Sequence, residues 1–133
     1  MLRFLLSLFI FLHLNATAEE KFEVSRLNAH QFTLGYVGFV GHISEAEKYM
    51  DVISKSPNAV QVFAKVIDDG SSTRVAKLYA LCGMKKAGGT ELEAYATKIM
   101  KVGGTVSTMY ADQMKKEDIS FFVNRIKYQE CNN

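Results

Sequence analysis

This 133-residue chain has only three histidines and two cysteines, and none of them lies in a catalytic motif. His30 and His42 flank a stretch in which Gly35, Gly38 and Gly41 recur at every third position. A nucleophilic enzyme needs a base beside a serine or cysteine, and a third group that orients the base. Neither histidine lies in a G-x-S-x-G motif. The sequence therefore predicts a non-enzymatic protein, with one alternative: a small enzyme or ligand carrier whose site is assembled from distant residues near His30 and His42.

Metal and cofactor motifs are also missing from the sequence. The chain has no C-x-x-C, H-x-x-x-H or EF-hand spacing, so neighbouring residues supply no clustered ligands. The three glycines do not match G-x-G-x-x-G or G-x-x-x-x-G-K-[ST], and no lysine follows them as in a phosphate loop. We expect neither a metal nor a cofactor.

The charge pattern argues against nucleic acid as a partner. The 16 basic and 14 acidic residues are interspersed, and the formal net charge is +2. Nucleic-acid-binding surfaces need clustered lysine and arginine side chains that neutralise phosphates. Lys85-Lys86 and Lys115-Lys116 are pairs and not patches. A protein partner is the better expectation.

The glycine-rich stretch carries the aromatic and branched residues that could contact such a partner. Tyr36, Phe39 and Val40 lie between its glycines, which would let another chain approach closely. Aromatic residues are enriched at the centre of protein interfaces. The alternative is that these three side chains fill the domain's own core. We take Tyr36, Phe39 and Val40 as the candidate partner contact.

The chain has two cysteines, Cys82 and Cys131. In an oxidising compartment an even pair tends to close into a disulfide. The bridge would close a loop of about 50 residues, which contributes on the order of 4 kcal/mol in the chain-entropy model. The alternative is a buried free Cys82 and a free Cys131 on a frayed tail. We expect a disulfide that ties a central helix to the C-terminal tail.

Residues 1–18 have the pattern of a cleavable export signal. Arg3 supplies a basic start, an apolar run follows over residues 4–14, and small residues precede a cleavage site between Ala18 and Glu19. The apolar run is shorter than the roughly 20 residues that span a bilayer. The alternative is that the run is retained as a membrane anchor.

Cleavage would leave residues 19–133 as one domain with no stable membrane span, because no second long apolar run follows. Removing Arg3 lowers the net charge to +1. The remaining chain has no Asn-x-Ser/Thr acceptor, which fits an exported bacterial protein. The sequence thus predicts a periplasmic or secreted location.

Capping residues and apolar periodicity predict two consecutive pairs of helices. Val75, Leu78, Tyr79 and Cys82 follow the i, i+3, i+4, i+7 spacing of a buried helical face. The segments 44–47 (SEAE) and 90–93 (TELE) predict capping boxes, in which Glu47 and Glu93 reach back to the cap residue. Ser71, Ser72 or Thr73 would begin the helix between them. The predicted pairs are 45–54 with 57–69, and 73–87 with 90–102.

Three further segments have weaker patterns. Residues 27–43 fit a helix or a strand, and we favour a helix because the chain offers few partner strands. Residues 105–109 are β-branched and predict a short strand or an extended connector. Asp118 is a plausible cap for a last helix with Ile119, Phe122 and Ile126 on its buried side.

The predicted fold is a small, mostly α single domain of five or six helices with two tandem α-hairpins. Over residues 44–103 this arrangement resembles the stacking of HEAT-like repeats, without shared signature residues. The predicted function is an exported non-enzymatic protein-binding domain, of the inhibitor or immunity type or an envelope assembly partner. Besides the enzyme or ligand-carrier alternative, a purely structural envelope protein remains open.

Overall fold

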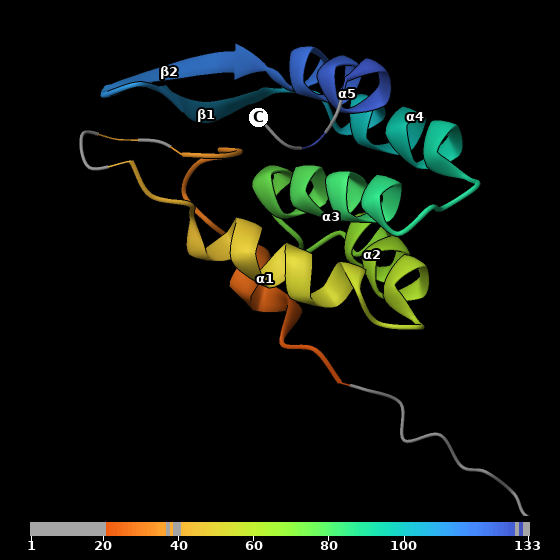
Figure 1. Ribbon diagram of the computed structural model, residues 1–133. Coiled ribbons are helices and arrows are strands. Elements are labelled where there is room, and N and C mark those ends of the chain that lie inside the picture. Colours follow the sequence, from red (N-terminus) through yellow and green to blue (C-terminus); the bar gives the residue numbers. More distant parts are fainter. Residues whose placement is uncertain (1–20, 37, 39–40, 130, 132–133) are drawn as a thin grey trace, which may run out of the picture.

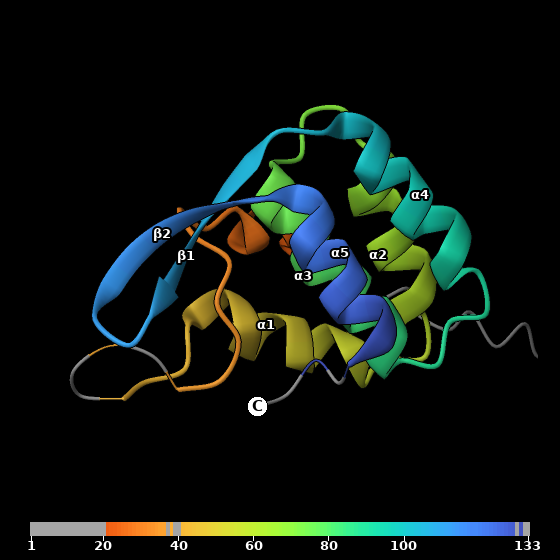
Figure 2. The same cartoon turned by 90° about the horizontal axis from the view of Figure 1, so that it is seen from above.

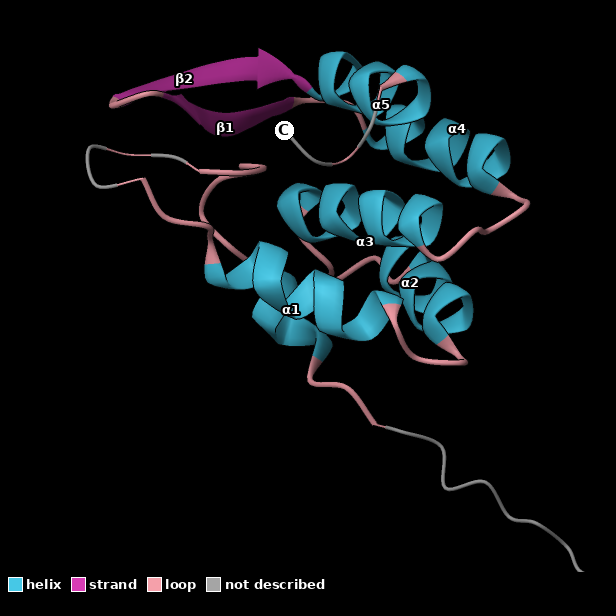
Figure 3. Ribbon diagram, viewed as in Figure 1, coloured by secondary structure: helices cyan, strands magenta, loops and turns pink. Residues whose placement is uncertain are grey.

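The chain folds into a mostly helical domain with one small sheet, as the computed structural model shows (Figures 1 and 3). The structure describes residues 21–36, 38, 41–129 and 131. The predicted export signal and the Ala18–Glu19 cleavage site lie outside these residues. Within the described part the elements are η1 (Val24–Leu27), α1 (Glu45–Ser54), α2 (Ala59–Asp68), α3 (Arg74–Lys86), α4 (Leu92–Val102), β1 (Thr105–Tyr110), β2 (Gln113–Asp118) and α5 (Ile119–Tyr128).

The predicted mostly helical fold is confirmed. The four middle helices begin and end within two residues of the predicted limits, and α5 begins directly after Asp118. Helix α1 packs on α3 and α2 packs on α4, as in two stacked hairpins, and α2 also packs along α3. No described helix is long and apolar enough to cross a membrane.

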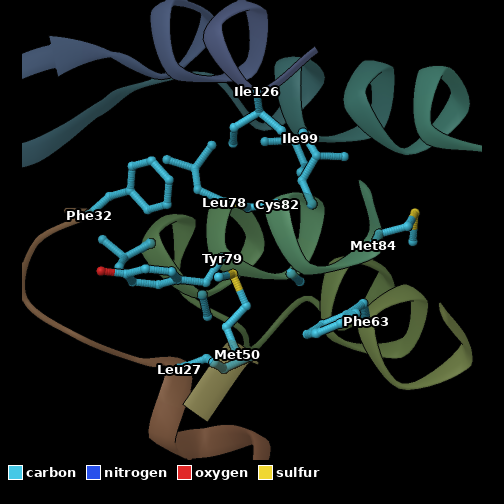
Figure 4. Close-up of a cluster of buried hydrophobic side chains, with 14 of the residues drawn as sticks. Leu27, Phe32, Met50, Phe63, Leu78, Tyr79, Cys82, Met84, Ile99 and Ile126 are labelled. Atoms are coloured by element: carbon cyan, nitrogen blue, oxygen red, sulfur yellow. The ribbon is translucent and has the colours of Figure 1, made fainter. Parts of the chain in front are cut away.

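Helix α3 is the centre of the molecule. Its residues from Val75 to Met84 are all buried. Figure 1 shows α1 and α2 on one side of α3, with α4, α5 and the hairpin on the other. Figure 4 shows Tyr79, Leu78 and Cys82 on α3 among core side chains from both sides, including Phe32, Met50 and Ile126. Two layers of elements therefore share one core built on α3.

The helix caps are formed in part as predicted. The hydroxyls of Ser44 and Thr73 each accept a backbone N–H three residues on, at 3.1 Å. The predicted bond from Glu47 back to the N-cap Ser44 is wrong, because Glu47 Oε2 accepts the N–H of Gly35 at 2.8 Å instead. The predicted second box is also wrong: α4 begins at Leu92, and its N-cap Glu91 makes no side-chain capping bond.

The helix favoured for residues 27–43 is wrong among the described residues. The 3₁₀ helix η1 ends at Leu27, and the described residues between it and Ser44 form no helix. Gly35, Gly38 and Gly41 have φ values of 76°, 80° and 61°, in the left-handed region that glycine adopts readily. The glycines therefore turn the chain repeatedly, which a helix does not allow.

The sheet is a two-stranded antiparallel hairpin. It pairs Thr105 with Asp118 at its base and Tyr110 with Gln113 at its tip. The open prediction for residues 105–109 is thus resolved as a strand, which buries Val106 and Thr108. Strand β2 escaped prediction because its sequence, QMKKED, is almost entirely polar and lacks a buried face.

The segment before α1 lies along the free edge of β1. The Phe32 N–H donates to Ser107 O at 2.8 Å, and Thr108 Oγ1 donates to Phe32 O at 2.7 Å. The buried Tyr79 hydroxyl, on α3, donates to Thr33 O at 2.9 Å and accepts from Thr33 N–H at 3.0 Å. This irregular segment is therefore fixed between α3 and the hairpin.

Candidate binding surface

Two connected hollows lie between the hairpin and α5, which diverge from Asp118 as Figure 2 shows. The inner pocket has a volume of about 170 Å³, and the outer groove about 590 Å³. Tyr110 and Arg125 line both, so we treat the two as one surface, the aromatic groove. Its other principal residues are Phe32, Thr33, Leu34, Tyr36 and Thr108 in the pocket, and Phe121, Asn124, Tyr128 and Gln129 in the groove.

The groove exposes aromatic rings on the face of α5 that points away from the core. Phe121 is 46% exposed and Tyr128 is 77% exposed, while Phe122 and Ile126 on the other face are buried. Tyr110, at the hairpin tip, is 37% exposed. Exposed aromatic residues gathered around an arginine are typical of protein-binding surfaces.

The charges around the groove are basic. No acidic residue is among the described residues that line it, whereas Arg125 lines both of its parts. Lys115 Nζ lies 5.2 Å from the centroid of the Tyr110 ring, and Lys127 Nζ lies 5.0 Å from that of Tyr128. Lys127 also pairs with Glu93 at 2.7 Å. Glu93 balances the charge of Lys127, so Arg125 and Lys115 are the cations that would favour a negatively charged ligand beside the rings.

The tip of the hairpin is held in a strained conformation at the edge of the inner pocket. Ala111 has φ 53°, a left-handed value that costs a residue with a side chain about 1 kcal/mol or more. Its carbonyl accepts the N–H of Gly38 at 3.1 Å. The glycine-rich loop and the hairpin thus meet at the pocket, which fixes the Tyr110 side of the groove.

The opposite wall is anchored through the C-terminal end of α5. Lys85 Nζ, from α3, donates to Ile126 O at 2.6 Å and Lys127 O at 3.3 Å, and also to Gln129 O. An ammonium group that binds the last carbonyls of a helix satisfies acceptors which the helix leaves open. Lys85 therefore fixes the end of the groove that carries Tyr128.

The two cysteines lie just beyond this wall. Cys82 and Cys131 are at disulfide distance, with their Cα atoms 5.7 Å apart. Cys82 is fully buried and Cys131 is 4% exposed. The predicted juxtaposition of the central helix and the tail is confirmed, and a buried cysteine pair at this distance suits an oxidising compartment.

The sequence-based partner contact falls partly on this surface. Tyr36 is 75% exposed and lines the inner pocket, whereas Phe39 and Val40 lie outside the described residues. Sequence reasoning missed Phe121 and Tyr128. The two residues are seven positions apart, on the side of the predicted last helix opposite its buried stripe, and this pattern could have indicated an exposed aromatic face.

The histidines of the alternative hypothesis are separated by the fold. His30 lines a cleft of about 530 Å³ beside the start of α3, and His42 is not among the residues of that cleft. His42 lies instead near Gly38, on which an added Cβ would approach its Cε1 to 3.5 Å. No group of three or more histidine, cysteine or acidic residues that could hold a metal occurs in the described part of the chain.

Two buried charged groups serve neighbouring backbone. Burial raises the pKa of the Glu47 carboxyl, although the hydrogen bond from Gly35 N–H opposes the shift. Burial lowers the pKa of Lys77, whose Nζ donates to Ile67 O at 2.6 Å and Asp69 O at 2.8 Å. These bonds hold the glycine-rich loop to α1 and the end of α2 to α3, so both groups have a structural role.

Comparison with known proteins yields no relative: no family model, curated protein or solved structure matches the chain. The chemistry of the aromatic groove is therefore the observation from which a function is inferred.

Proposed function

We propose that this chain is an exported, non-enzymatic binding protein that holds a segment of another protein in the aromatic groove. The observation that carries the proposal is the exposure of Phe121, Tyr128 and Tyr110 around Arg125. Tyrosine and arginine are the residue types that most often dominate binding energy at interfaces. The rings also stand on α5 and on a hairpin, which are fixed elements, so little ordering cost opposes binding.

The charge of the groove sets the chemistry of the partner. Arg125 lines the groove and Lys115 flanks the Tyr110 ring, while the described lining has no carboxylate. The charge of Lys127, beside Tyr128, is balanced by Glu93. Opposite charge speeds association and discourages basic competitors. The expected partner segment is therefore acidic and carries one or two apolar side chains that rest on the rings of Phe121 and Tyr128.

Export is part of the proposal. The predicted signal over residues 1–18 and the buried pair of Cys82 and Cys131 both support a periplasmic or secreted location. A small exported domain that binds protein suits an inhibitor or immunity-type role, or assembly in a bacterial envelope. A toxin gene beside its own gene would favour the first role, and an envelope operon the second.

The test is a pull-down from envelope extract with matched variants. Phe121→Ala removes an aromatic side chain from the groove, and Val52→Ala removes an exposed apolar side chain from α1. We expect Phe121→Ala to weaken capture of a stoichiometric partner by about 30-fold, the effect of losing an aromatic anchor worth about 2 kcal/mol. Val52→Ala should bind as the wild type does. Absence of a partner, or equal loss in both variants, would contradict the proposal.

A further inference from the structure

A second hollow, the basic cleft, opens at the base of the hairpin. It has a volume of about 530 Å³, within the usual range for small-ligand sites. The cleft lies between the start of α3, the end of α4 and the hairpin. Its lining comprises Ala29, His30, Ser72, Thr73, Arg74, Val75, Val102, Thr105, Val106, Ser107 and Lys116.

The strand register places a lysine in this cleft. Ser107 pairs with Lys116 across the hairpin, so both side chains leave the same face of the sheet. The preceding residue, Lys115, pairs with Thr108 and points to the opposite face, where its Nζ lies over the Tyr110 ring. Adjacent lysines therefore serve different surfaces: Lys115 flanks the aromatic groove and Lys116 lines the basic cleft.

A pair of glycines positions the second cation. The Nε of Arg74 donates to Gly103 O at 2.6 Å. Gly104 has φ 90°, and a Cβ on it would come within 2.7 Å of the Arg74 guanidinium carbon. The guanidinium of Arg74 thus occupies the space that a side chain on Gly104 would fill. Its Nη groups carry four of the five N–H donors and are suited to hold an anion.

The remaining polar groups of the cleft do not cancel this charge. His30 and the hydroxyls of Ser72 and Ser107 add hydrogen-bonding groups, and no carboxylate is among the described lining residues. Asp118 shares the face of β2 that carries Lys116, and its Oδ1 accepts from Ser120 N–H at 2.8 Å. The lining therefore carries a net positive charge in a hollow large enough for a small molecule.

We propose that the basic cleft binds the anionic group of a small ligand, a phosphate ester or a carboxylate. Arg74 and Lys116 supply the charges, and Ser72, Ser107 and His30 supply further hydrogen bonds to the anion's oxygens. The proposal is independent of protein binding at the aromatic groove, because the two surfaces share no lining residue. It also gives His30 a role without a second histidine.

The experiment is a titration of the isotope-labelled chain followed by NMR, with inorganic phosphate and, separately, succinate. Ionic strength is held constant with sodium chloride, since exposed charges are screened by salt. We expect saturable shifts of the amide signals of Ser107, Lys116 and His30, with a dissociation constant on the order of millimolar, as for a few exposed contacts. Tighter binding of phosphate would assign a phosphate ester, and tighter binding of succinate a carboxylate.

Matched variants separate a site from general attraction. Lys116→Gln should weaken anion binding by about five- to tenfold. Lys55→Gln makes the same change in charge at a residue that lines neither surface, and should leave anion binding unchanged. Both lysines are exposed, so neither variant should disturb the fold. Equal weakening by the two variants, or shifts that never saturate, would overturn the proposal. Failure at the aromatic groove would leave this result unaffected.

Discussion

Among single residues, Glu47 makes a different contact from the helix-capping bond that its position predicts. It occupies the third position of α1, where it was expected to reach back to the cap residue. Its side chain is instead buried, and its Oε2 accepts the N–H of Gly35. Burial disfavours the charged form and so raises the pKa of its carboxyl. The contribution of this carboxyl to stability therefore depends on pH.

We predict that Glu47→Gln removes one component of the pH dependence of stability. A carboxyl with a raised pKa in the folded state favours folding below its unfolded pKa of about 4.5, and this contribution is lost as pH rises through the folded pKa. Relative to the variant, the wild type should thus gain stability as pH falls from 7 towards 4.5. Urea unfolding of both proteins across this range measures the difference.

Glu45→Gln provides the control on the same turn of α1. The hydrogen bond from Lys48 lowers the pKa of the Glu45 carboxyl, so its contribution is present at neutral pH and is lost as pH falls. The two variants should therefore shift the pH dependence in opposite directions. A Glu47→Gln profile parallel to that of the wild type would contradict the assignment.

At the scale of elements, the contact between α2 and α3 depends on a glycine inside a helix. Gly83 lies on α3 opposite the ring of Phe63 from α2, which Figure 4 shows in the core. A Cβ on Gly83 would lie 2.7 Å from Phe63 Cε1 and closer still to Cζ. The missing side chain is thus what lets the two helices approach.

We predict that Gly83→Ala destabilises the protein, although alanine is the better helix former. The helix propensity of alanine contributes about 1 kcal/mol in its favour. Forcing the Phe63 ring aside should cost more, because overpacking a core costs roughly 1–3 kcal/mol and the two ring contacts are both severe. Chemical denaturation measures the net effect. Gly70→Ala is the control, since no atom lies within 4 Å of its added Cβ. A Gly83→Ala variant more stable than the wild type would contradict the close contact between Gly83 and Phe63.

At the scale of the whole molecule, the tail is tied to the central helix at two places. Lys85 binds the carbonyls at the end of α5, and Cys82 meets Cys131 two residues beyond Gln129. The cysteine pair joins positions 49 residues apart. Both attachments fix the end of α5 that carries Tyr128. Loss of either should loosen one wall of the aromatic groove as well as the fold.

We predict that Cys131→Ser lowers the free energy of unfolding by about 2–4 kcal/mol, the usual effect of losing a disulfide that closes a loop of this length. Mass spectrometry of the unreduced wild type should show a chain lighter by two hydrogens than the reduced one. A mass equal to that of residues 19–133 would confirm cleavage of the export signal before Glu19. Thiol reductant should destabilise the wild type and leave the variant unaffected. Equal stability of wild type and variant would mean that the two cysteines do not bond.

Local patterns in the sequence specify the helices of this protein but not the residues that form its binding surfaces. Caps and apolar periodicity act over a few residues, so α1, α3 and α5 could be predicted from the caps Ser44, Thr73 and Asp118. Helices α2 and α4 could be predicted from their apolar stripes. The glycine-rich segment was misjudged because its shape depends on distant contacts, such as that of Gly35 with Glu47. Strand β2 has no buried face and gains its order from pairing with β1.

The tertiary structure alone decided which residues meet at the candidate sites. Tyr36 is far from Tyr110 and Phe121 in the sequence, but all three line the aromatic groove. They meet because the hairpin and α5 diverge from Asp118, and the segment before α1 lies beneath the hairpin. The register of the hairpin separates Lys115 from Lys116. Local propensity fixes which elements form, whereas binding surfaces arise from packing between elements that no local pattern encodes.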